Sequence, residues 1–248
     1  MNYKQIAELI AKSPKKTPAK IWLQGSFREG DFKGQDFLAF GEGRFRVLIG
    51  DYGRIDKWLK SHRGRVKAVH LDLEARYSAL PLLDLRKVKA RVEPGAIIRQ
   101  GAAIGRDCVI MMGAVINIGA RVGQRTMVDM NAVLGARAVV GRNCHIGAGA
   151  VIAGVLEPPS LKPVIVEDEV LVGANAVVLE GVRVGRGSVV AAGAVVVRNV
   201  PRGTVVAGVP AKVIKKVTDI DRKDKISLLG ILRGTEQGEK LAPRRSAD

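Results

Sequence analysis

Aromatic residues, cysteines and histidines are scarce in this chain of 248 residues. Aromatic residues make up 4% of it, and there are two cysteines and three histidines. Two thiols cannot form a disulfide framework, and without His or carboxylate at ligand spacing they make a poor zinc site. No apolar run approaches the roughly 18 residues of a membrane span, and the first twenty residues lack a signal-peptide core. We therefore expect a cytoplasmic protein with no membrane association and no metal.

The strong positive charge of the chain forms no basic run. The net charge is +17, and Lys plus Arg exceed Asp plus Glu by 19 to 10 in residues 1–90, by 14 to 8 in residues 91–215 and by 8 to 6 in residues 216–248. This spread, with no aromatic residues interleaved for base stacking, argues against a nucleic-acid partner. It is typical of a soluble basic surface; a second interpretation is attraction of anionic small molecules.

A branched aliphatic residue recurs at every sixth position from Val92 to Ile152, and again from Val166 to Val196. A period of six fits neither a lone strand nor a helix. It is typical of a chain wound into stacked coils, each made of short strands joined by tight turns. Three hexads per coil make eighteen residues, so the seventeen hexads predict between five and six coils.

Two residue types take fixed places within the hexads. Glycine commonly follows the aliphatic residue, as at Gly105 and Gly123, where we expect a tight turn with unusual dihedral angles. A small residue usually stands four places after the aliphatic one, and Cys108 and Cys144 occupy this slot. We therefore expect both thiols to be buried, reduced packing residues.

The flanking segments differ from the hexads in composition, because all aromatic residues precede residue 78. Apolar periodicity predicts helices at residues 2–12 and 51–62 and strands at residues 20–27 and 44–50. After the hexads, residues 203–215 are predicted to form a final turn or strand. The apolar positions of residues 217–233 indicate an amphipathic helix.

These segments predict three domains: an N-terminal α/β cap domain at residues 1–90, a β-helix domain at 91–215, and a C-terminal helix with a flexible tail at 216–248. Within the β-helix, residues 153–165 contain three prolines and must leave the coil. A loop extruded from a regular solenoid is a favoured place for function, and a plain surface excursion is the alternative.

The hexads resemble the left-handed parallel β-helix of the hexapeptide-repeat acyltransferases. Two stretches, TMVDMNAVLG at 126–135 and VLEPPSLKP at 155–163, resemble one branch more specifically: the tetrahydrodipicolinate N-acyltransferases of the diaminopimelate and lysine pathway. The N-acetyl form matches best, because the succinyl form typically carries a longer helical N-terminal domain. The resemblance implies a mainly β enzyme that uses acetyl-CoA, acts as a homotrimer with active sites between neighbouring prisms, and carries a small N-terminal α/β domain and a C-terminal helix.

The same resemblance assigns site residues. Asp129, in TMVD, matches the carboxylate that binds or activates the amino substrate, and Glu180, in VVLEG, matches its acidic partner. Arg91, in ARVEPGA, matches an arginine that contacts a substrate carboxylate. Two further substrate-binding candidates are Arg99 and Asn117. The candidates for binding coenzyme A are Gly154, Ala174, Ala192 and Lys212.

These residue types suit direct acyl transfer. Ring-opened tetrahydrodipicolinate carries two carboxylates and an ammonium group, which must lose a proton before it attacks a thioester. A carboxylate can take that proton, and an arginine can grip a substrate carboxylate with two hydrogen bonds. The acyl group then passes from sulfur to nitrogen without a nucleophilic Ser or Cys.

Three other functions remain open. Succinyl-CoA is an alternative donor for the same reaction. A sugar or serine O-acetyltransferase of this fold would make His145 essential. A metal-binding β-helix needs three histidines at each metal site, and the three in this chain are His62, His70 and His145, two of them in the cap domain.

Overall fold

The computed structural model describes residues 2–154 and 162–219. By internal contacts the chain divides into two compact units, one formed by residues 9–81 and the other by residues up to 8 together with those from 82 onward. Each unit has a hydrophobic core of its own. The three domain boundaries inferred from the sequence stay a prediction.

The smaller unit is a four-stranded antiparallel sheet in the order β2-β3-β1-β4. Its strands are β1 (Pro18–Gly25), β2 (Phe37–Phe40), β3 (Phe45–Asp51) and β4 (Val66–Leu73). Helix α2 (Tyr52–Ser61) buries Ile55 and Trp58 in one core with Ile21 and Leu48. The side chain of Asp51 caps this helix by accepting a hydrogen bond from the backbone N–H of Gly53 at 3.0 Å.

The predicted elements of this region are present, with two additions. The expected helices correspond to α1 (Tyr3–Lys12) and α2, and the expected strands to β1 and β3. Strands β2 and β4 were not predicted. Short 3₁₀ turns lie at Glu29–Phe32, Arg63–Arg65 and Leu85–Lys87.

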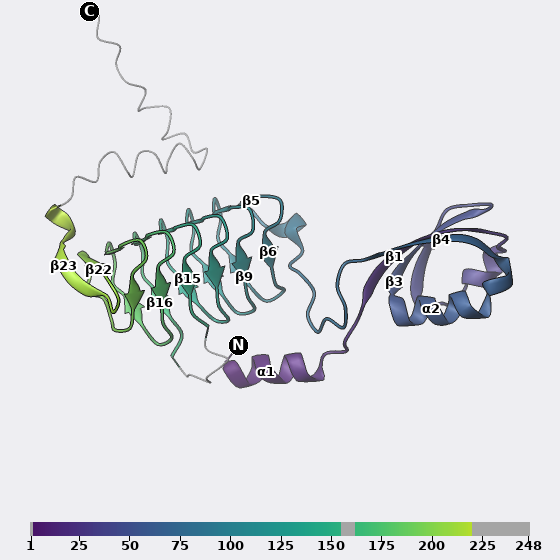
Figure 1. Cartoon of the computed structure of the whole chain (residues 1–248), viewed down its shortest axis with the longest axis horizontal. Coiled ribbons are helices and arrows are strands. Elements are labelled where there is room, and N and C mark those ends of the chain that lie inside the picture. Colours follow the sequence, from purple (N-terminus) through teal and green to yellow (C-terminus); the bar gives the residue numbers. More distant parts are fainter. Residues whose placement is uncertain (1, 155–161, 220–248) are drawn as a thin grey trace, which may run out of the picture. The chain divides into compact units, whose positions relative to one another are not determined.

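The larger unit is a β-solenoid, drawn as stacked coils in Figure 1. It contains a two-residue strand for each predicted hexad, with the aliphatic residue second. The strands are β5 (Arg91–Val92), β6 (Ile97–Ile98), β7 (Ala103–Ile104), β8 (Val109–Ile110), β9 (Val115–Ile116), β10 (Arg121–Val122), β11 (Met127–Val128), β12 (Val133–Leu134), β13 (Val139–Val140), β14 (His145–Ile146), β15 (Val151–Ile152), β16 (Ile165–Val166), β17 (Leu171–Val172), β18 (Val177–Val178), β19 (Arg183–Val184), β20 (Val189–Val190) and β21 (Val195–Val196).

These strands form three parallel sheets. The first sheet contains β5, β8, β11, β14, β17 and β20, and the second contains β6, β9, β12, β15, β18 and β21; the third contains β7, β10, β13, β16 and β19. Each strand pairs with the strand eighteen residues further on, as Arg91 does with Val109, except where the chain between β15 and β16 is longer. The predicted β-helix is therefore confirmed.

The inside of the solenoid is filled as the hexads predict. Ile110, Ile116 and Leu134 have no exposed surface, and the small residues Ala114 and Ala132 are equally buried. Cys108 and Cys144 are buried and form no disulfide, as expected. Each coil therefore covers the apolar edge of its neighbours, which is how a solenoid is stabilised.

The glycines after the aliphatic residues have a different role from the one expected. A Cβ on Gly105 would lie 2.6 Å from the backbone nitrogen of Gln124, and one on Gly123 would lie 2.5 Å from the carbonyl carbon of Gly141. Neither has a positive φ; positive φ angles occur two residues later, at Asp107 (59°) and Arg125 (55°). These glycines are required by the close approach of adjacent coils, so the expectation of unusual dihedral angles was wrong.

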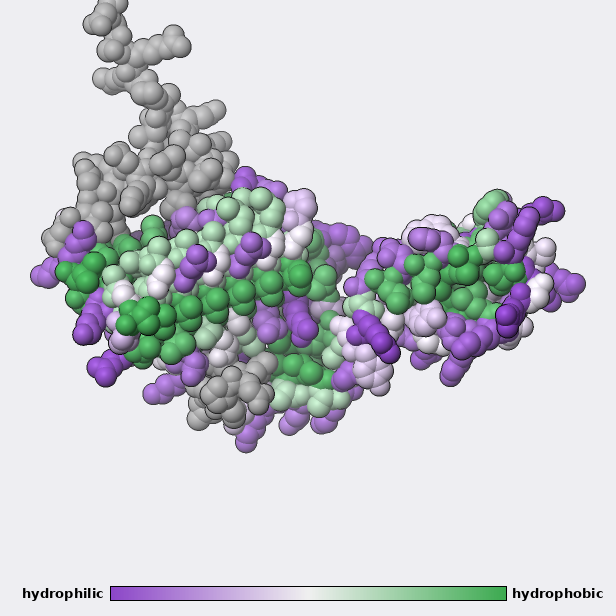
Figure 2. Space-filling model, in the orientation of Figure 1, coloured by the Kyte–Doolittle hydropathy of each residue, from purple (hydrophilic) through white to green (hydrophobic). Residues whose placement is uncertain are grey.

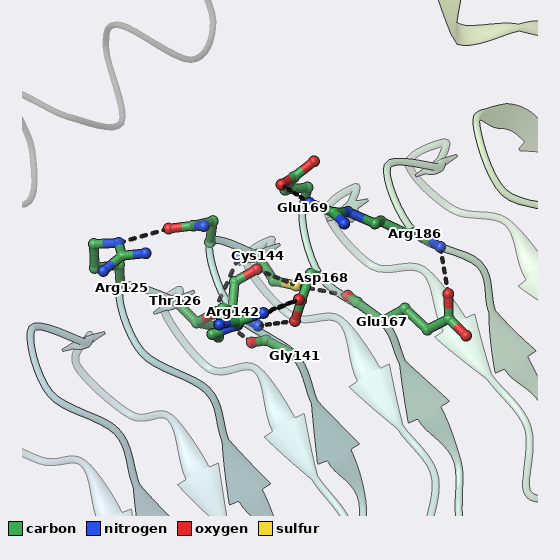
Figure 3. Close-up of polar contacts among 10 residues, drawn as sticks. Arg125, Thr126, Gly141, Arg142, Cys144, Glu167, Asp168, Glu169 and Arg186 are labelled. Atoms are coloured by element: carbon green, nitrogen blue, oxygen red, sulfur yellow. Dashed lines mark hydrogen bonds and ion pairs between the residues drawn. The ribbon is translucent and has the colours of Figure 1, made fainter.

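Buried donors and surface ion pairs stabilise the turns that lead from the third sheet to the first (Figure 3). The Thr126 hydroxyl donates to the carbonyl of Gly141 at 2.7 Å, and the Cys144 thiol donates to that of Glu167 at 3.0 Å. On the outside, Arg142 pairs with Asp168 at 2.9 Å. Burial raises the pKa of the Cys144 thiol to about 11.

Beyond β21 the chain forms β22 (Thr204–Ala207) and β23 (Lys212–Lys216), an antiparallel pair that extends the first sheet. This agrees with the final turn or strand predicted at residues 203–215. A 3₁₀ turn at Val217–Asp219 follows. The helix predicted at 217–233 lies otherwise outside the described residues, as does the tail.

Candidate active site

Most of the predicted site residues lie at two edges of the solenoid. The first edge is the column of turns that lead from the first sheet to the second. The second edge is the column of turns that lead from the second sheet to the third. In each coil these turns begin at the residue directly after the second, aliphatic residue of a strand. At Asp129 and Asn117 this residue has a polar side chain.

At the first edge, Asp129 follows β11 and both its carboxylate oxygens have partners. The oxygen Oδ1 accepts a hydrogen bond from the backbone N–H of Met130 at 2.8 Å. The oxygen Oδ2 lies 3.4 Å from Nε2 of His145. The two side chains are 17% and 23% exposed, so both are largely withdrawn from solvent but still reachable.

His145 reaches Asp129 because of the coil length. It is the first residue of β14, which pairs with β11 and places His145 beside Met127. The first residue of each strand points outward, and Asp129 lies two residues beyond Met127 at the neighbouring turn. From the sequence, His145 was expected to be essential in a sugar or serine O-acetyltransferase, and the structure brings it to Asp129.

Small residues continue the first edge from Asp129 toward the C-terminal end. The positions equivalent to Asp129 and Met130 in the following coils carry no side chain larger than a methyl group. They are Gly147, Ala148, Gly173, Ala174, Ala191 and Ala192. Lys212, in β23, lies at the end of the same sheet and is exposed. Three of the predicted coenzyme A residues, Ala174, Ala192 and Lys212, are thus arranged along one line.

The second edge carries Arg99, Asn117, Gly154 and Glu180. Arg99 and Asn117 are half-buried neighbours in adjacent coils, because they follow the paired strands β6 and β9. The Asn117 side chain accepts a hydrogen bond from the backbone N–H of Ile118 at 2.8 Å. Glu180 is exposed and follows β18, three coils beyond Asn117.

Within one protomer the two predicted catalytic carboxylates are not brought together. Asp129 is on the first edge and Glu180 is on the second, and their strands belong to coils two steps apart, which is about 10 Å along the axis. Arg91 is on the first sheet, two coils before Asp129, where its guanidinium lies 3.2 Å from Glu93 and 3.7 Å from the sulfur of Met111.

An uninterrupted apolar row separates the two edges. The outward residue of every strand in the second sheet is a branched aliphatic: Ile97, Val115, Val133, Val151, Val177 and Val195. Ile97 is 47% exposed, and the five valines are half-buried. Figure 2 shows a continuous hydrophobic stripe along the solenoid in the region where Figure 1 labels β6, β9 and β15. The third sheet differs, since it presents Arg121 and Arg183 at such positions.

A groove that the sequence did not indicate lies beside the second edge. It has a volume of about 360 Å³ and is lined by Gly101, Gly119, Arg121, Arg137 and Pro163, among others. Its two arginines make it suitable for an anion. In the sequence, Arg121 stands at the outward position of its hexad, where an aliphatic residue is common. This arginine was the feature that could have indicated the groove.

Two general features limit the kinds of site present in the described part of the chain. Among residues 2–154 and 162–219, no three His, Cys, Asp or Glu side chains gather as metal ligands would. Within the same ranges, no helix is long and apolar enough to cross a membrane.

The repeats define the class of protein. Residues 119–154 match a family model described as bacterial transferase hexapeptide (six repeats), and residues 95–118 and 163–198 match one described as hexapeptide repeat of succinyl-transferase. Together with the solenoid, these matches identify a hexapeptide-repeat transferase. Residues 1–85 match a third model, described as tetrahydrodipicolinate succinyltransferase N-terminal.

Curated relatives narrow this to one family. The chain is 62% identical over 236 residues to the 2,3,4,5-tetrahydropyridine-2,6-dicarboxylate N-acetyltransferase of Thermotoga sp. (strain RQ2). The aligned residues cover 95% of this chain and 100% of the relative. It is likewise 62% identical to the enzyme of that name from Thermotoga maritima, over 95% of this chain and 99% of the relative. The chain belongs to the tetrahydropyridine-dicarboxylate N-acetyltransferase family, and the resemblance seen in its motifs is confirmed.

Solved structures resemble the solenoid more distantly. PerB from Caulobacter crescentus, crystallised with CoA and GDP-perosamine, is 30% identical, with a TM-score of 0.45 over 50% of this chain and 57% of that chain.

Proposed function

We propose that this protein transfers the acetyl group of acetyl-CoA to the amine of ring-opened tetrahydrodipicolinate, a step of diaminopimelate and lysine biosynthesis. The observation that carries the proposal is 62% identity over nearly the whole chain to enzymes of that name. The acceptor is a dianion, and the positive charge of the chain would favour its approach. A cytoplasmic location is part of the same proposal.

The active enzyme is a homotrimer in this proposal, and each site needs two protomers. Three solenoids stand around a threefold axis with the aliphatic row of the second sheet turned inward. The first edge of one solenoid then lies beside the second edge of the next. This arrangement buries six exposed or half-exposed aliphatic residues per protomer, and it joins the two sets of predicted site residues into one cleft.

In that cleft, Asp129 of one protomer faces the second edge of its neighbour. Asp129 receives the amine, Arg91 holds a substrate carboxylate, and Arg99 and Asn117 contribute from the neighbour. Glu180 lies further toward the C-terminal end and holds the ammonium group of the long acceptor before deprotonation. The metal-free transfer requires only that amine and thioester be aligned and the amine be deprotonated.

Coenzyme A lies along the first edge in this proposal. The line of glycines and alanines beyond Asp129 leaves room for the extended pantetheine arm, and Lys212 at its end meets a phosphate. Gly154 borders the same cleft from the neighbouring second edge. The thioester then ends beside Asp129, where the amine attacks.

Succinyl-CoA is the second candidate donor, because two of the family models are described by that transferase. A thiol-release assay with each donor, with and without tetrahydrodipicolinate, tests the proposal. We expect acceptor-dependent release with acetyl-CoA, at a rate well above that with succinyl-CoA. The reverse preference would change the donor, and no acceptor-dependent release with either would refute the function.

A further inference from the structure

Strand β4 is an edge strand of the smaller unit, and one of its sides is open. The order of the sheet is β2-β3-β1-β4, and β1 is the strand recorded beside β4 among residues 2–154 and 162–219. Seven of the eight residues of β4 are exposed, and the opposite edge strand, β2, has only four residues. Edge strands are usually protected by lysine, proline or a bulge. In β4 the single lysine, Lys67, is near the start, and no proline is present.

The backbone of β4 places a regular row of hydrogen-bonding groups at this open side. Antiparallel strands bond to one neighbour through every second residue, and the backbone N–H of Glu74 donates to the carbonyl of Pro18 in β1 at 3.2 Å. The even-numbered residues of β4 therefore bond to β1, and the odd-numbered ones from Lys67 to Leu73 turn their N–H and C=O groups outward. Among residues 2–154 and 162–219, no backbone partner of these outward groups is recorded.

Three of the outward-bonding residues also have exposed apolar side chains. Val69, Leu71 and Leu73 are 53%, 40% and 43% exposed. They lie opposite buried residues of β1, as Leu71 does opposite Ile21, so they share the face of the sheet that packs against α2. The described core of the smaller unit contains residues of β1, β2, β3 and α2 but none of β4. An apolar strip along the edge is therefore left open to solvent.

The sequence of β4 is complementary to itself in one antiparallel register. When Leu71 lies opposite Leu71 of a second copy, Val69 lies opposite Leu73 on the same face, so the two apolar strips meet. On the other face, His70 lies opposite Asp72 at two symmetric places. An imidazole N–H can donate a hydrogen bond to a carboxylate at each of them.

The neighbouring registers match less well. Moving the twofold axis to His70 places Lys67 opposite Leu73 and Asp72 opposite Ala68. Moving it to Asp72 places two carboxylates opposite each other, which is destabilising. Among these three registers, the one centred on Leu71 pairs apolar residues with apolar residues and imidazole with carboxylate. This self-complementarity favours a second copy of the chain over an unrelated strand as the partner.

We propose that β4 is an interaction surface for a second copy of this chain. Two β4 strands pair antiparallel about a twofold axis at Leu71 and join two four-stranded sheets into one continuous sheet. The inference goes beyond the proposed function and uses no residue of the solenoid. Because each copy contributes a single strand, the contact is small, and it joins chains reversibly at concentrations above those at which the proposed trimer forms.

A cysteine on the twofold axis tests the contact by trapping it. Cα atoms of opposed residues in a hydrogen-bonded antiparallel pair are about 5.5 Å apart, which a disulfide can span. Mild oxidation of full-length Leu71→Cys should therefore give a disulfide-linked pair of chains on a non-reducing gel. Leu38→Cys is the matched control, because Leu38 is an exposed leucine on the other edge strand. The native thiols, Cys108 and Cys144, are buried in the solenoid.

Two further cysteine variants test the register. Val69→Cys and Leu73→Cys should each form little disulfide alone, because each is four residues, about 14 Å along the strand, from the same position in the second copy. A mixture of the two proteins should form the disulfide readily, since these positions are opposite each other. Equal yields from Val69→Cys alone and from Leu71→Cys would show random collision and overturn the proposal.

The cross-linking has two other outcomes that would overturn the proposal. One is a Leu71→Cys protein that forms disulfide no faster than Leu38→Cys. The other is a Leu71→Cys thiol that does not react with maleimide in the native protein, which would show that the edge is covered within its own chain. Disulfide formation does not depend on trimers of the solenoid, so a failure of this contact is distinguishable from a failure of the proposed trimer.

A charge on the axis provides a second measurement, without a covalent bond. Leu71→Lys places two ammonium groups opposite each other, and Leu38→Lys is its control. In sedimentation over rising concentration, the mean mass of the wild type and of Leu38→Lys should grow toward twice its value at micromolar concentration, and that of Leu71→Lys should stay constant. Circular dichroism establishes that both variants are folded. A Leu71→Lys protein that associates as the wild type does would overturn the proposal.

Discussion

Replacing Val133 by Glu is the sharpest test of the threefold arrangement. Val133 is the half-buried outward residue of β12, in the middle of the aliphatic row. In the proposed trimer, three copies of the substitution would place three carboxylates around one axis. Burying one unpaired carboxylate costs several kcal/mol, so three cost on the order of 10 kcal/mol. At 1.4 kcal/mol per tenfold change, the association constant should fall by roughly seven powers of ten.

Val139→Glu is the matched control. Val139 is the half-buried outward residue of β13, in the same coil, but it belongs to the third sheet. Analytical ultracentrifugation at micromolar concentration should show wild-type and Val139→Glu trimers and Val133→Glu monomers. The circular dichroism of the monomer should stay that of a β-protein, because its own inward residues are unchanged.

Thiol release should disappear with the proposed trimer, since each of its clefts would take residues from two protomers. A Val133→Glu protein that sediments as the wild type would refute the inward position of the second sheet. A monomer with full activity would refute the shared cleft. Equal dissociation by both substitutions would show that the effect is not specific to the second sheet.

Four further outcomes are expected. Asp129→Asn should remove most turnover while the trimer survives in ultracentrifugation, and Glu180→Gln should lower kcat more than it weakens coenzyme A binding; unchanged turnover would refute either role. The Cys144 thiol, with its pKa raised to about 11 by burial, should react with Ellman's reagent only as fast as the protein unfolds; rapid reaction of two thiols in the native protein would contradict this. The pKa values of Asp168 and Glu167 are lowered by hydrogen bonds from Arg142 and Arg183, so their contribution to stability is present above their ordinary pKa values and is lost as pH falls through the lowered ones. Asp168→Asn should therefore flatten the acid side of a plot of Tm against pH, and an unchanged slope would contradict the ion pairs.

The solenoid was predictable from the sequence because each hexad acts locally. An aliphatic residue such as Leu134 is buried wherever a coil lies on either side of it, so the period alone places the strand. The smaller unit was less predictable. Strand β4 alternates apolar and polar residues only over the five positions from Val69 to Leu73, and it is specified by pairing with β1, some fifty residues earlier. Such non-local pairing leaves little signal in a short window.

The candidate site was predictable as a set of residues, and its arrangement was not. Motif resemblance named Asp129 and Glu180 without showing that they lie at different edges. The proximity of His145 to Asp129 follows from the coil length: a residue lies beside the one eighteen positions later, so position 145 falls next to 127 and close to 129. That relation was readable in the hexads. The proposed meeting of the two edges was not, because it would require a second copy of the chain.

The constant coil of eighteen residues also determines how such a chain can change in length. Inserting a single residue within β12, for example, would turn every later aliphatic residue toward solvent, whereas adding a whole coil would leave the stacking intact and only lengthen the column. The longer stretch between β15 and β16 shows the other permitted solution, since the pairing of Val139 with Ile165 resumes in step after it. Natural and engineered variants of this protein should therefore differ in length by complete coils or by loops inserted at turns. A donor-binding channel along the solenoid axis would then be lengthened or shortened by whole coils.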